Sequence, residues 1–178
     1  MSETQQVTRL SVPDDWTSFE REEFAQQVVD FIKARTDDGK DINNQSFAGY
    51  SDSYASSLDF RIAGKSKSTV NLRLSGEMMD TVDLISHTAG TIFLGFQSGT
   101  DANDKAAWAA ASDNGPSRKF LGLDDAALNR LVSQFETTAG IDARRQGSQA
   151  ESSGFSAAAI LSRRVLLAAF RRIAVRAP

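Results

Sequence analysis

The longest regular pattern of apolar residues follows Thr17 and has the spacing of one face of a helix. These apolar residues are Phe24, Val28, Phe31 and Ile32. Thr17 and Glu20 fit a capping box, in which the two side chains satisfy the first backbone amides of a helix. The Asp-Asp-Gly sequence at 37–39 is a typical stop signal. The pattern therefore predicts a helix that begins near Thr17 and ends before residue 37.

The middle of the chain changes to patterns that are typical of strands. Apolar and polar residues alternate over 70–74, and Phe60 with Ile62 indicates a shorter strand before it. A short helix is expected to start after Gly76. The β-rich runs 84–88 and 91–96 flank Ala-Gly and predict a hairpin.

Helical patterns return in the second half. Residues 101–112 are rich in alanine, and Asp124 is the expected N-cap of the next helix. Residues 140–155 are rich in Gly, Ser and Gln, as in a linker. From 156 to 178 arginines alternate with aliphatic residues, and no acidic residue occurs there.

These patterns predict an α+β fold, with a small antiparallel sheet, flanking helices and an N-terminal helix. Four parts are expected: a flexible N-terminal arm (1–16), an α+β domain (17–139), the linker (140–155) and a basic amphipathic helical arm (156–178).

Composition excludes several kinds of chemistry. The chain has no cysteine and one histidine, His87, which excludes disulfides, thiolate sites and metal sites built from histidines. Phosphate-binding loops and the nucleophile elbow of hydrolases do not occur in the sequence. We therefore expect no catalytic residues, no cofactor and no metal site. A weaker alternative is an enzyme that uses Asp80, Asp83 or His87.

Neither a signal peptide nor a membrane span is expected. The first residues are polar and acidic, and no run of about 18 apolar residues occurs. The net charge of -3 at pH 7 gives the whole chain no strong preference for polyanions.

Several aromatic and basic residues are candidates for a contact between subunits. Tyr50 and Tyr54 lie in a long polar segment that cannot form a core, so the domain or a neighbouring subunit must cover them. Trp108 stands in a helix of alanines and is expected to fill either a core or a subunit contact. Phe120 anchors its loop and is also an interface candidate. Arg118 either caps carbonyl groups within the chain or pairs across an interface.

The basic helix at 156–178 adds five interface candidates: Arg163, Arg164, Phe170, Arg171 and Arg172. The helix could bind a neighbouring subunit, contact nucleic acid through its arginines, or lie on a membrane surface. The start of the first predicted helix is acidic, so opposite charges near the two ends would permit head-to-tail pairing between copies.

One ordered set of segments resembles a known family. The tyrosine–serine segment 47–54 comes first, then the strand 70–75 leads into Gly-Glu-Met-Met-Asp at 76–80. The hairpin, a helix with Lys-Ala at 105–106, and Pro-Ser-Arg-Lys-Phe-Leu-Gly-Leu at 116–123 follow. This order resembles the virion morphogenesis proteins of tailed phages, which are also called tail-completion, neck or head–tail joining proteins. The resemblance covers roughly residues 24–136.

The resemblance implies a structural virion protein rather than an enzyme. Its subunits would form a homo-oligomeric ring between the portal and the tail, as a neck, tail-completion or tail-terminator protein assembled in the host cytoplasm. Expected partners are further copies of the chain, portal-adaptor proteins and tail proteins, with DNA passing through the lumen. The alternative is a module that binds DNA or another anionic partner through its arginine-rich helix.

Overall fold

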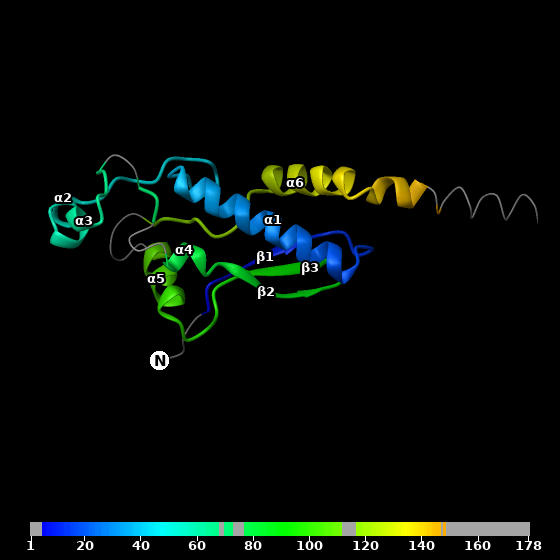
Figure 1. Cartoon of the computed structure of the whole chain (residues 1–178), viewed down its shortest axis with the longest axis horizontal. Helices are drawn as coiled ribbons and strands as arrows, with labels where there is room; N and C mark the ends of the chain where they lie inside the picture. The colour runs from blue at the N-terminus through cyan, green and yellow to red at the C-terminus, as the bar shows by residue number, and fades with distance from the viewer. Residues whose placement is uncertain (1–4, 68–69, 73–76, 112–116, 147, 149–178) are drawn as a thin grey trace, which may run out of the picture. The chain divides into compact units, whose positions relative to one another are not determined.

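The computed structural model describes residues 5–67, 70–72, 77–111, 117–146 and 148. The chain divides into two compact units, residues 1–132 and residues 133–178. The first unit combines helices with a three-stranded antiparallel sheet, which confirms the predicted α+β class (Figure 1). The predicted basic helix at 156–178 lies outside the described residues.

The sheet has the strand order β1-β3-β2. The predicted hairpin is confirmed as β2 (Asp83–Thr88) and β3 (Thr91–Gly95). Ile92 and Leu94 of the central strand are fully buried. A β-bulge between Leu84 and Ser86 shifts the register of β2 against β3.

The third strand, β1 (Val7–Ser11), was not predicted. It pairs antiparallel with β3, so that Leu10 lies opposite Ile92. The expected N-terminal arm is therefore wrong for these residues. Without β1 the open edge of β3 would leave a row of backbone groups unpaired. At Gly95 a Cβ atom would lie 2.2 Å from the carbonyl oxygen of Gln6, so the close approach of the two strands requires glycine.

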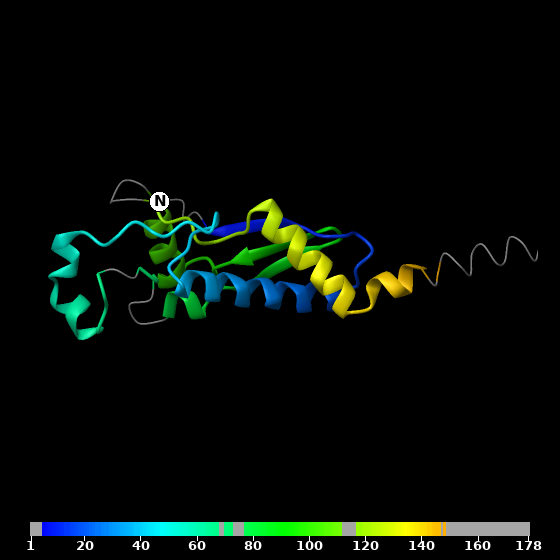
Figure 2. The ribbon, with the colours of Figure 1, turned by 90° about the horizontal axis from the view of Figure 1, so that it is seen from above.

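Helix α1 (Ser18–Asp37) packs against β2 and β3 and runs along one face of the sheet (Figure 2). Its predicted capping box is confirmed: the amide of Glu20 donates to Thr17 Oγ1 at 3.2 Å, and the amide of Thr17 donates to Glu20 Oε2 at 2.7 Å. The predicted apolar residues Phe24, Val28 and Ile32 are fully buried, which supplies most of the driving force for this packing.

Two shorter helices lie near the C-terminal end of α1. Helix α4 (Glu77–Asp80) follows the prediction and buries Met78 and Met79. It packs against α5 (Asp101–Ala110), which Thr100 caps. The buried Asn103 of α5 accepts a hydrogen bond from the amide of Gln6 at 2.7 Å and thereby ties α5 to the chain just before β1.

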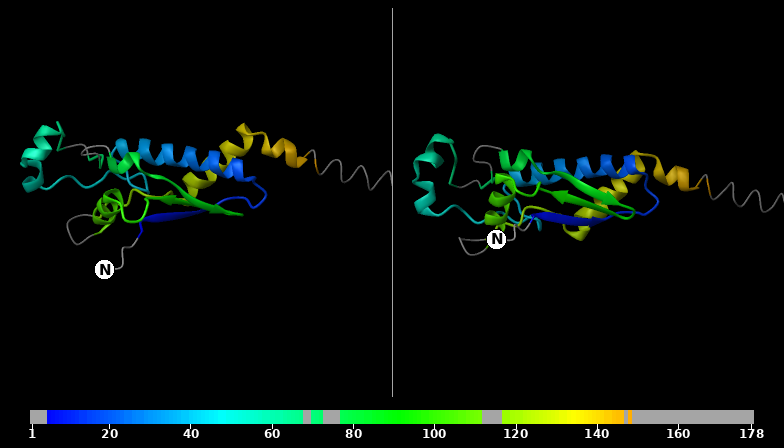
Figure 3. Two further views of the ribbon diagram at one scale, coloured as in Figure 1. Left: turned by 60° about the horizontal axis from the view of Figure 1, so that its bottom comes forward. Right: turned by 90° about the horizontal axis from the view of Figure 1, so that it is seen from below.

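The segment between α1 and α4 differs most from its prediction. Helices α2 (Asp52–Ala55) and α3 (Leu58–Ile62) replace the expected loop and the strand around Phe60. Ser51 and Ser57 cap them, and such local hydrogen bonds favour short helices over an isolated strand. Residues 70–72 form no strand, and 73–74 lie outside the described residues. In Figure 3 both helices lie beyond the end of α1, away from the sheet.

Helix α6 (Asp125–Thr138) begins as predicted in the first unit and continues into the second. Asp124 accepts a hydrogen bond from the amide of Ala127 at 2.6 Å. Gly122 has a φ of +121°, a conformation that favours glycine, and this allows the sharp entry to the helix. Just before this turn Phe120 packs edge-on against Phe96 in the core.

The second unit is described only over residues 133–146 and 148. Residues 141–146 are helical, so the linker predicted for 140–155 is wrong over its first part, and most of its remainder lies outside the described residues. The helical turn buries Ile141, and Arg145 pairs with Glu136 at 2.7 Å. These contacts explain why this part of the segment is ordered despite its polar composition.

Candidate functional site

Four of the predicted interface residues line one pocket of about 220 Å³ in the first unit. They are Tyr50, Tyr54, Trp108 and Arg118. We call this site the aromatic pocket. Its apolar wall also includes Leu72, Met78 and Ala109, and its other charged residues are Lys65 and Lys105. In the part of the chain that the structure describes, the charged side chains on its lining are thus all basic.

One side of the pocket belongs to residues 47–67, which we call the α2–α3 segment. Tyr50, Tyr54 and Phe60 pack against one another with ring centroids 5.2 to 5.4 Å apart. Two of the three pairs are edge-to-face, the geometry that aromatic quadrupoles favour. Only Phe60 is buried, so this small cluster holds the two short helices together without a core of its own.

Arg118 connects the α2–α3 segment to the rest of the first unit. Its backbone amide donates to the carbonyl of Ala109 at 2.9 Å. The guanidinium donates to the carbonyls of Ala48 and Gly49 at 3.3 and 3.4 Å and lies 5.4 Å from the centre of the Tyr50 ring. Of the two roles predicted for Arg118, the structure therefore shows the carbonyl-capping one.

Lys65 is the second basic side chain that contacts Tyr50. Its Nζ donates to the Tyr50 hydroxyl at 3.3 Å and lies 5.4 Å from the ring centre. Burial lowers the pKa of Lys65 below its ordinary value. Burial raises the pKa of the Tyr50 phenol, while Arg118 and the backbone amides of Asn71 and Leu72 oppose this rise.

Leu72 has an unusual backbone for a residue with a branched side chain, with a φ of +56°. Such a conformation is strained for residues other than glycine and persists only where the surroundings hold it in place. Here the amide of Leu72 points to the Tyr50 hydroxyl, and its side chain lines the pocket. The strained turn thus helps to shape the apolar wall.

Large apolar side chains of the first unit are exposed at Trp108 in the pocket and on α3. Trp108 is 59% exposed, so it does not fill the core of the chain, which was one of its two predicted roles. Leu58 and Ile62 of α3 are 68% and 74% exposed and stand four residues apart, on one helix face. The opposite face of α3 buries Phe60. α3 therefore turns an apolar face outward.

The remaining predicted site residues do not join this pocket. Phe120 is buried in the core, so its anchoring role is confirmed and it does not form part of the surface. The candidates of the basic helix, Arg163, Arg164, Phe170, Arg171 and Arg172, lie outside the described residues. Lys65, Lys105, Leu58 and Ile62 were missed. The only signal for Leu58 and Ile62 was the apolar spacing around Phe60, where the prediction placed a strand with Phe60 and Ile62, and the two lysines gave no such signal.

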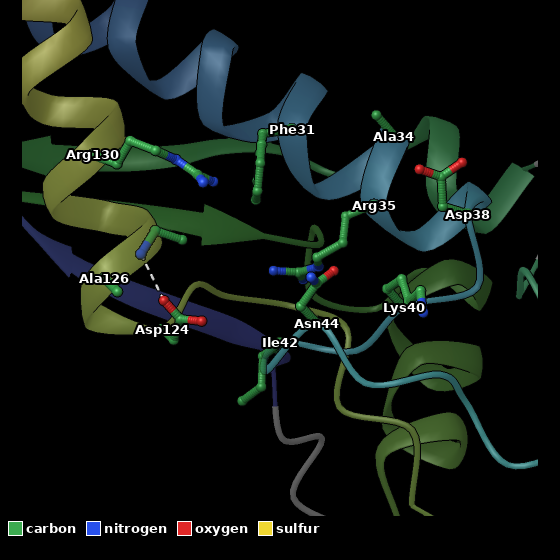
Figure 4. Close-up of a pocket in the computed structure, with 11 residues that line it drawn as sticks. Phe31, Ala34, Arg35, Asp38, Lys40, Ile42, Asn44, Asp124, Ala126 and Arg130 are labelled. Carbon is green, nitrogen blue, oxygen red and sulfur yellow. Dashed lines mark hydrogen bonds between the residues drawn. The ribbon is translucent and has the colours of Figure 1, made fainter.

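A second pocket, of about 380 Å³, surrounds the buried Arg35 (Figure 4). Arg35 donates hydrogen bonds to the carbonyls of Phe120 and Gly122, and both Arg35 and Arg130 lie over the ring of Phe31, 5.8 and 5.9 Å from its centre. Burial lowers the pKa of Arg35, and the nearby carboxylates Asp41 and Asp124 oppose this effect.

The polar groups of the Arg35 pocket serve the fold. Arg35 fixes the turn that leads to α6, and Asp124 caps that helix. Acidic and basic side chains line the pocket together, since Asp38 and Asp124 face Arg35, Lys40 and Arg130. We therefore assign this pocket a structural role.

The residues of the weaker enzymatic alternative are not assembled into a site in the part of the chain that the structure describes. His87 of β2 contacts Glu22 and Arg21 of α1, each at 3.3 Å. Asp80 and Asp83 belong to α4 and β2 and are both exposed. Over the same residues, no group of three or more His, Cys, Asp or Glu side chains could hold a metal ion.

Among the described residues, no helix is both long enough and apolar enough to cross a bilayer. No protein-family model matches the sequence, and neither a characterised protein nor a solved structure is significantly similar to it.

Proposed function

We propose that this chain is a non-enzymatic structural subunit of a tailed-phage particle. Its copies associate into a ring at the head–tail junction, as a neck, tail-completion or tail-terminator protein. The ring binds portal-adaptor proteins on one side and tail proteins on the other. The observations that carry this proposal are the outward apolar face of α3 and the exposed Trp108 of the aromatic pocket.

This surface has the character of an association site. Single exposed apolar residues are normal on soluble proteins, whereas neighbouring exposed apolar side chains on one face mark contact sites. Leu58 and Ile62 share one face of α3, and Trp108 stands at the pocket of the same unit. Burying side chains of this size stabilises a complex by about 1.5–3 kcal/mol each. Aromatic residues and arginine are also the types that dominate binding energy at interfaces.

The proposed position of the ring, at the head–tail junction, is supported by the resemblance of residues 24–136 to phage neck proteins. Two segments that carry this resemblance, 47–54 and 116–123, supply Tyr50, Tyr54 and Arg118 to the aromatic pocket. Among the described residues, the lining of the pocket offers neither a carboxylate nor an imidazole, which suits binding better than acid–base chemistry.

The experiment compares self-association of three purified chains by mass photometry and negative-stain microscopy. The unaltered chain should form rings. The double variant Leu58→Ser/Ile62→Ser should lose them while circular dichroism stays unchanged. The matched control is Asp59→Ser/Arg61→Ser, which alters the same helix at two exposed polar positions and should still assemble. An unaltered chain that stays monomeric at every concentration and never enters phage particles would refute the proposal.

A further inference from the structure

The N-terminal end of α1 carries an exposed surface of opposite character to the aromatic pocket. Phe19 is 66% exposed, and Glu22 and Glu23 follow it at the spacing that places all three on one helix face. We call these three residues the acidic patch. The nearby Arg21 is turned away from solvent by its bonds to the Trp16 carbonyl and to His87.

The acidic patch and the aromatic pocket lie at opposite ends of α1, within the first unit. Twenty residues of helix span about 30 Å, and the patch lies within the first two turns. Near the other end Lys33 donates to the carbonyl of Asp80 in α4, the helix whose Met78 lines the pocket. Figures 1 and 2 show the same arrangement, with α4 and α5 beside the C-terminal end of α1. One copy therefore cannot place its own patch in its own pocket.

The two surfaces complement each other in charge and in polarity. The patch offers one aromatic ring flanked by two carboxylates. The pocket offers an apolar, aromatic wall surrounded by Lys65, Lys105 and Arg118. An inserted phenylalanine would bury its ring against this wall, while its two glutamates would meet basic groups at the rim. Complementary charges of this kind also fix register and disfavour wrong partners.

We propose that the acidic patch of one copy docks into the aromatic pocket of the next copy, with Phe19 as the inserted side chain. The contact joins two different surfaces, so it is heterologous: a docked pair still has one free patch and one free pocket for further copies. Such contacts close into a ring when the rotation between copies allows it. This inference rests on the proposed self-association and names the surfaces that carry it.

Charge reversal on each surface tests the pairing. The pocket variant is Lys65→Glu/Lys105→Glu, and the patch variant is Glu22→Lys/Glu23→Lys. Each variant alone should dissociate at a protein concentration at least about tenfold higher than the unaltered chain, because like charges then face each other. A mixture of the two should assemble again, since every basic patch then meets an acidic pocket and every acidic patch a basic pocket. The control Asp30→Lys/Asp83→Lys reverses two exposed carboxylates elsewhere and should assemble normally.

Trp108 gives an independent readout at the pocket. The chain has two tryptophans, and Trp16 is buried against Phe24. In a Trp16→Phe background the emission of Trp108 should shift to the blue as the unaltered surfaces associate, because the docked patch covers the indole. The shift should be lost in either charge-reversed variant and should return in their mixture.

The outcomes separate this inference from the function on which it rests. If the unaltered chain forms rings and both reversed variants form them equally well, the pairing is wrong and the proposed function stands. If both variants fail alone and their mixture also fails, the two surfaces do not bind each other. If the unaltered chain never associates and never enters particles, the proposed function fails and the pairing fails with it.

Discussion

The body of the first unit and the α2–α3 segment hold their structure in different ways. In the body, which consists of α1 and the three strands, the side chains of Phe24, Ile32 and Leu94 are fully buried. In the α2–α3 segment, Phe60 is the one buried apolar side chain, while Leu58 and Ile62 face outward. The segment depends instead on ring contacts, short helix caps and two basic side chains over Tyr50.

This difference assigns folding stability to the body and binding to the α2–α3 segment. Burial of apolar area is the largest favourable contribution to folding, so the body should determine the free energy of unfolding of the first unit. In the α2–α3 segment Leu58 and Ile62 remain exposed, so a partner that covers them gains the free energy of burying their apolar area. A region with few buried contacts also opens locally at low cost, which suits a surface that adjusts to a neighbour.

The largest expected effect comes from truncating the core of the body. Phe24→Ala removes a fully buried ring that packs edge-on against Trp16 at 5.0 Å. It should lower the free energy of unfolding by about 3–5 kcal/mol, measured by urea denaturation. Leu58→Ala in the α2–α3 segment should change it by less than about 0.5 kcal/mol. Similar losses for the two variants would contradict the distinction between body and segment.

Arg35 provides the next largest effect, because it is a charged side chain inside the body. Arg35→Met keeps much of the volume and leaves the carbonyls of Phe120 and Gly122 without their donor. We expect a loss of about 2–3 kcal/mol in the free energy of unfolding, since hydrogen bonds to charged groups are the stronger ones. The control Arg9→Met replaces an exposed arginine of β1 and should change the value by less than about 0.5 kcal/mol. Equal effects would show that the bonds of Arg35 contribute nothing.

The same two regions explain how much of the fold could be predicted from the sequence. The helix of the body follows from its period and its capping box, and the hairpin follows from the Ala-Gly turn at 89–90. Both signals are local. Strand β1 could not be predicted this way, because its five residues become a strand only by pairing with β3, whose residues lie 80 to 88 positions further along the chain.

Four of the ten predicted interface candidates, Tyr50, Tyr54, Trp108 and Arg118, line one pocket, but the sequence did not indicate that they come together. The tyrosines were chosen because a polar segment cannot cover them, Trp108 because it stands among alanines, and Arg118 because packing did not explain it. Lys65 and Lys105 lack any such signal, since exposed lysines are common in every helix and loop. The apolar spacing of Leu58, Phe60 and Ile62 fits a strand, and the caps at Ser51 and Ser57 favour short helices instead.

Removal of a helix cap should have a smaller effect on the free energy of unfolding, and it tests the body and the α2–α3 segment separately. Thr17→Ala removes the cap of α1 and should lower the free energy of unfolding by about 1 kcal/mol, because α1 folds together with the sheet. Ser57→Ala removes the cap of α3 in the same way. Its effect on global unfolding should be only a few tenths of a kcal/mol, since the α2–α3 segment can open by itself. Hydrogen exchange at the amide of Phe60 should nevertheless become faster in Ser57→Ala, and unchanged exchange would show that α3 is not held by its cap.

The smallest expected effect is a shift in tyrosine ionisation, and it reports on the α2–α3 segment alone. The chain has two tyrosines, Tyr50 and Tyr54, and both belong to this segment. Burial raises the pKa of each above the ordinary value of 10.0. The absorbance of tyrosinate should therefore appear at higher pH in the native chain than in concentrated urea, and Tyr54→Phe isolates the titration of Tyr50.

The sign of the linked stability follows from these raised pKa values. A phenol whose pKa is higher in the folded chain contributes stability that is complete below pH 10.0 and is lost as the pH rises through the folded pKa. Lys65 acts in the opposite direction, because burial lowers its pKa below 10.5 and stability is gained as the pH rises toward that value. In Lys65→Met this compensation is gone, so alkaline pH should loosen the segment more strongly while circular dichroism of the body stays constant. Coincident titration curves in native and unfolded chains would mean that the two rings are as exposed to water as those of an unfolded chain, and that no aromatic pocket exists for a neighbour to fill.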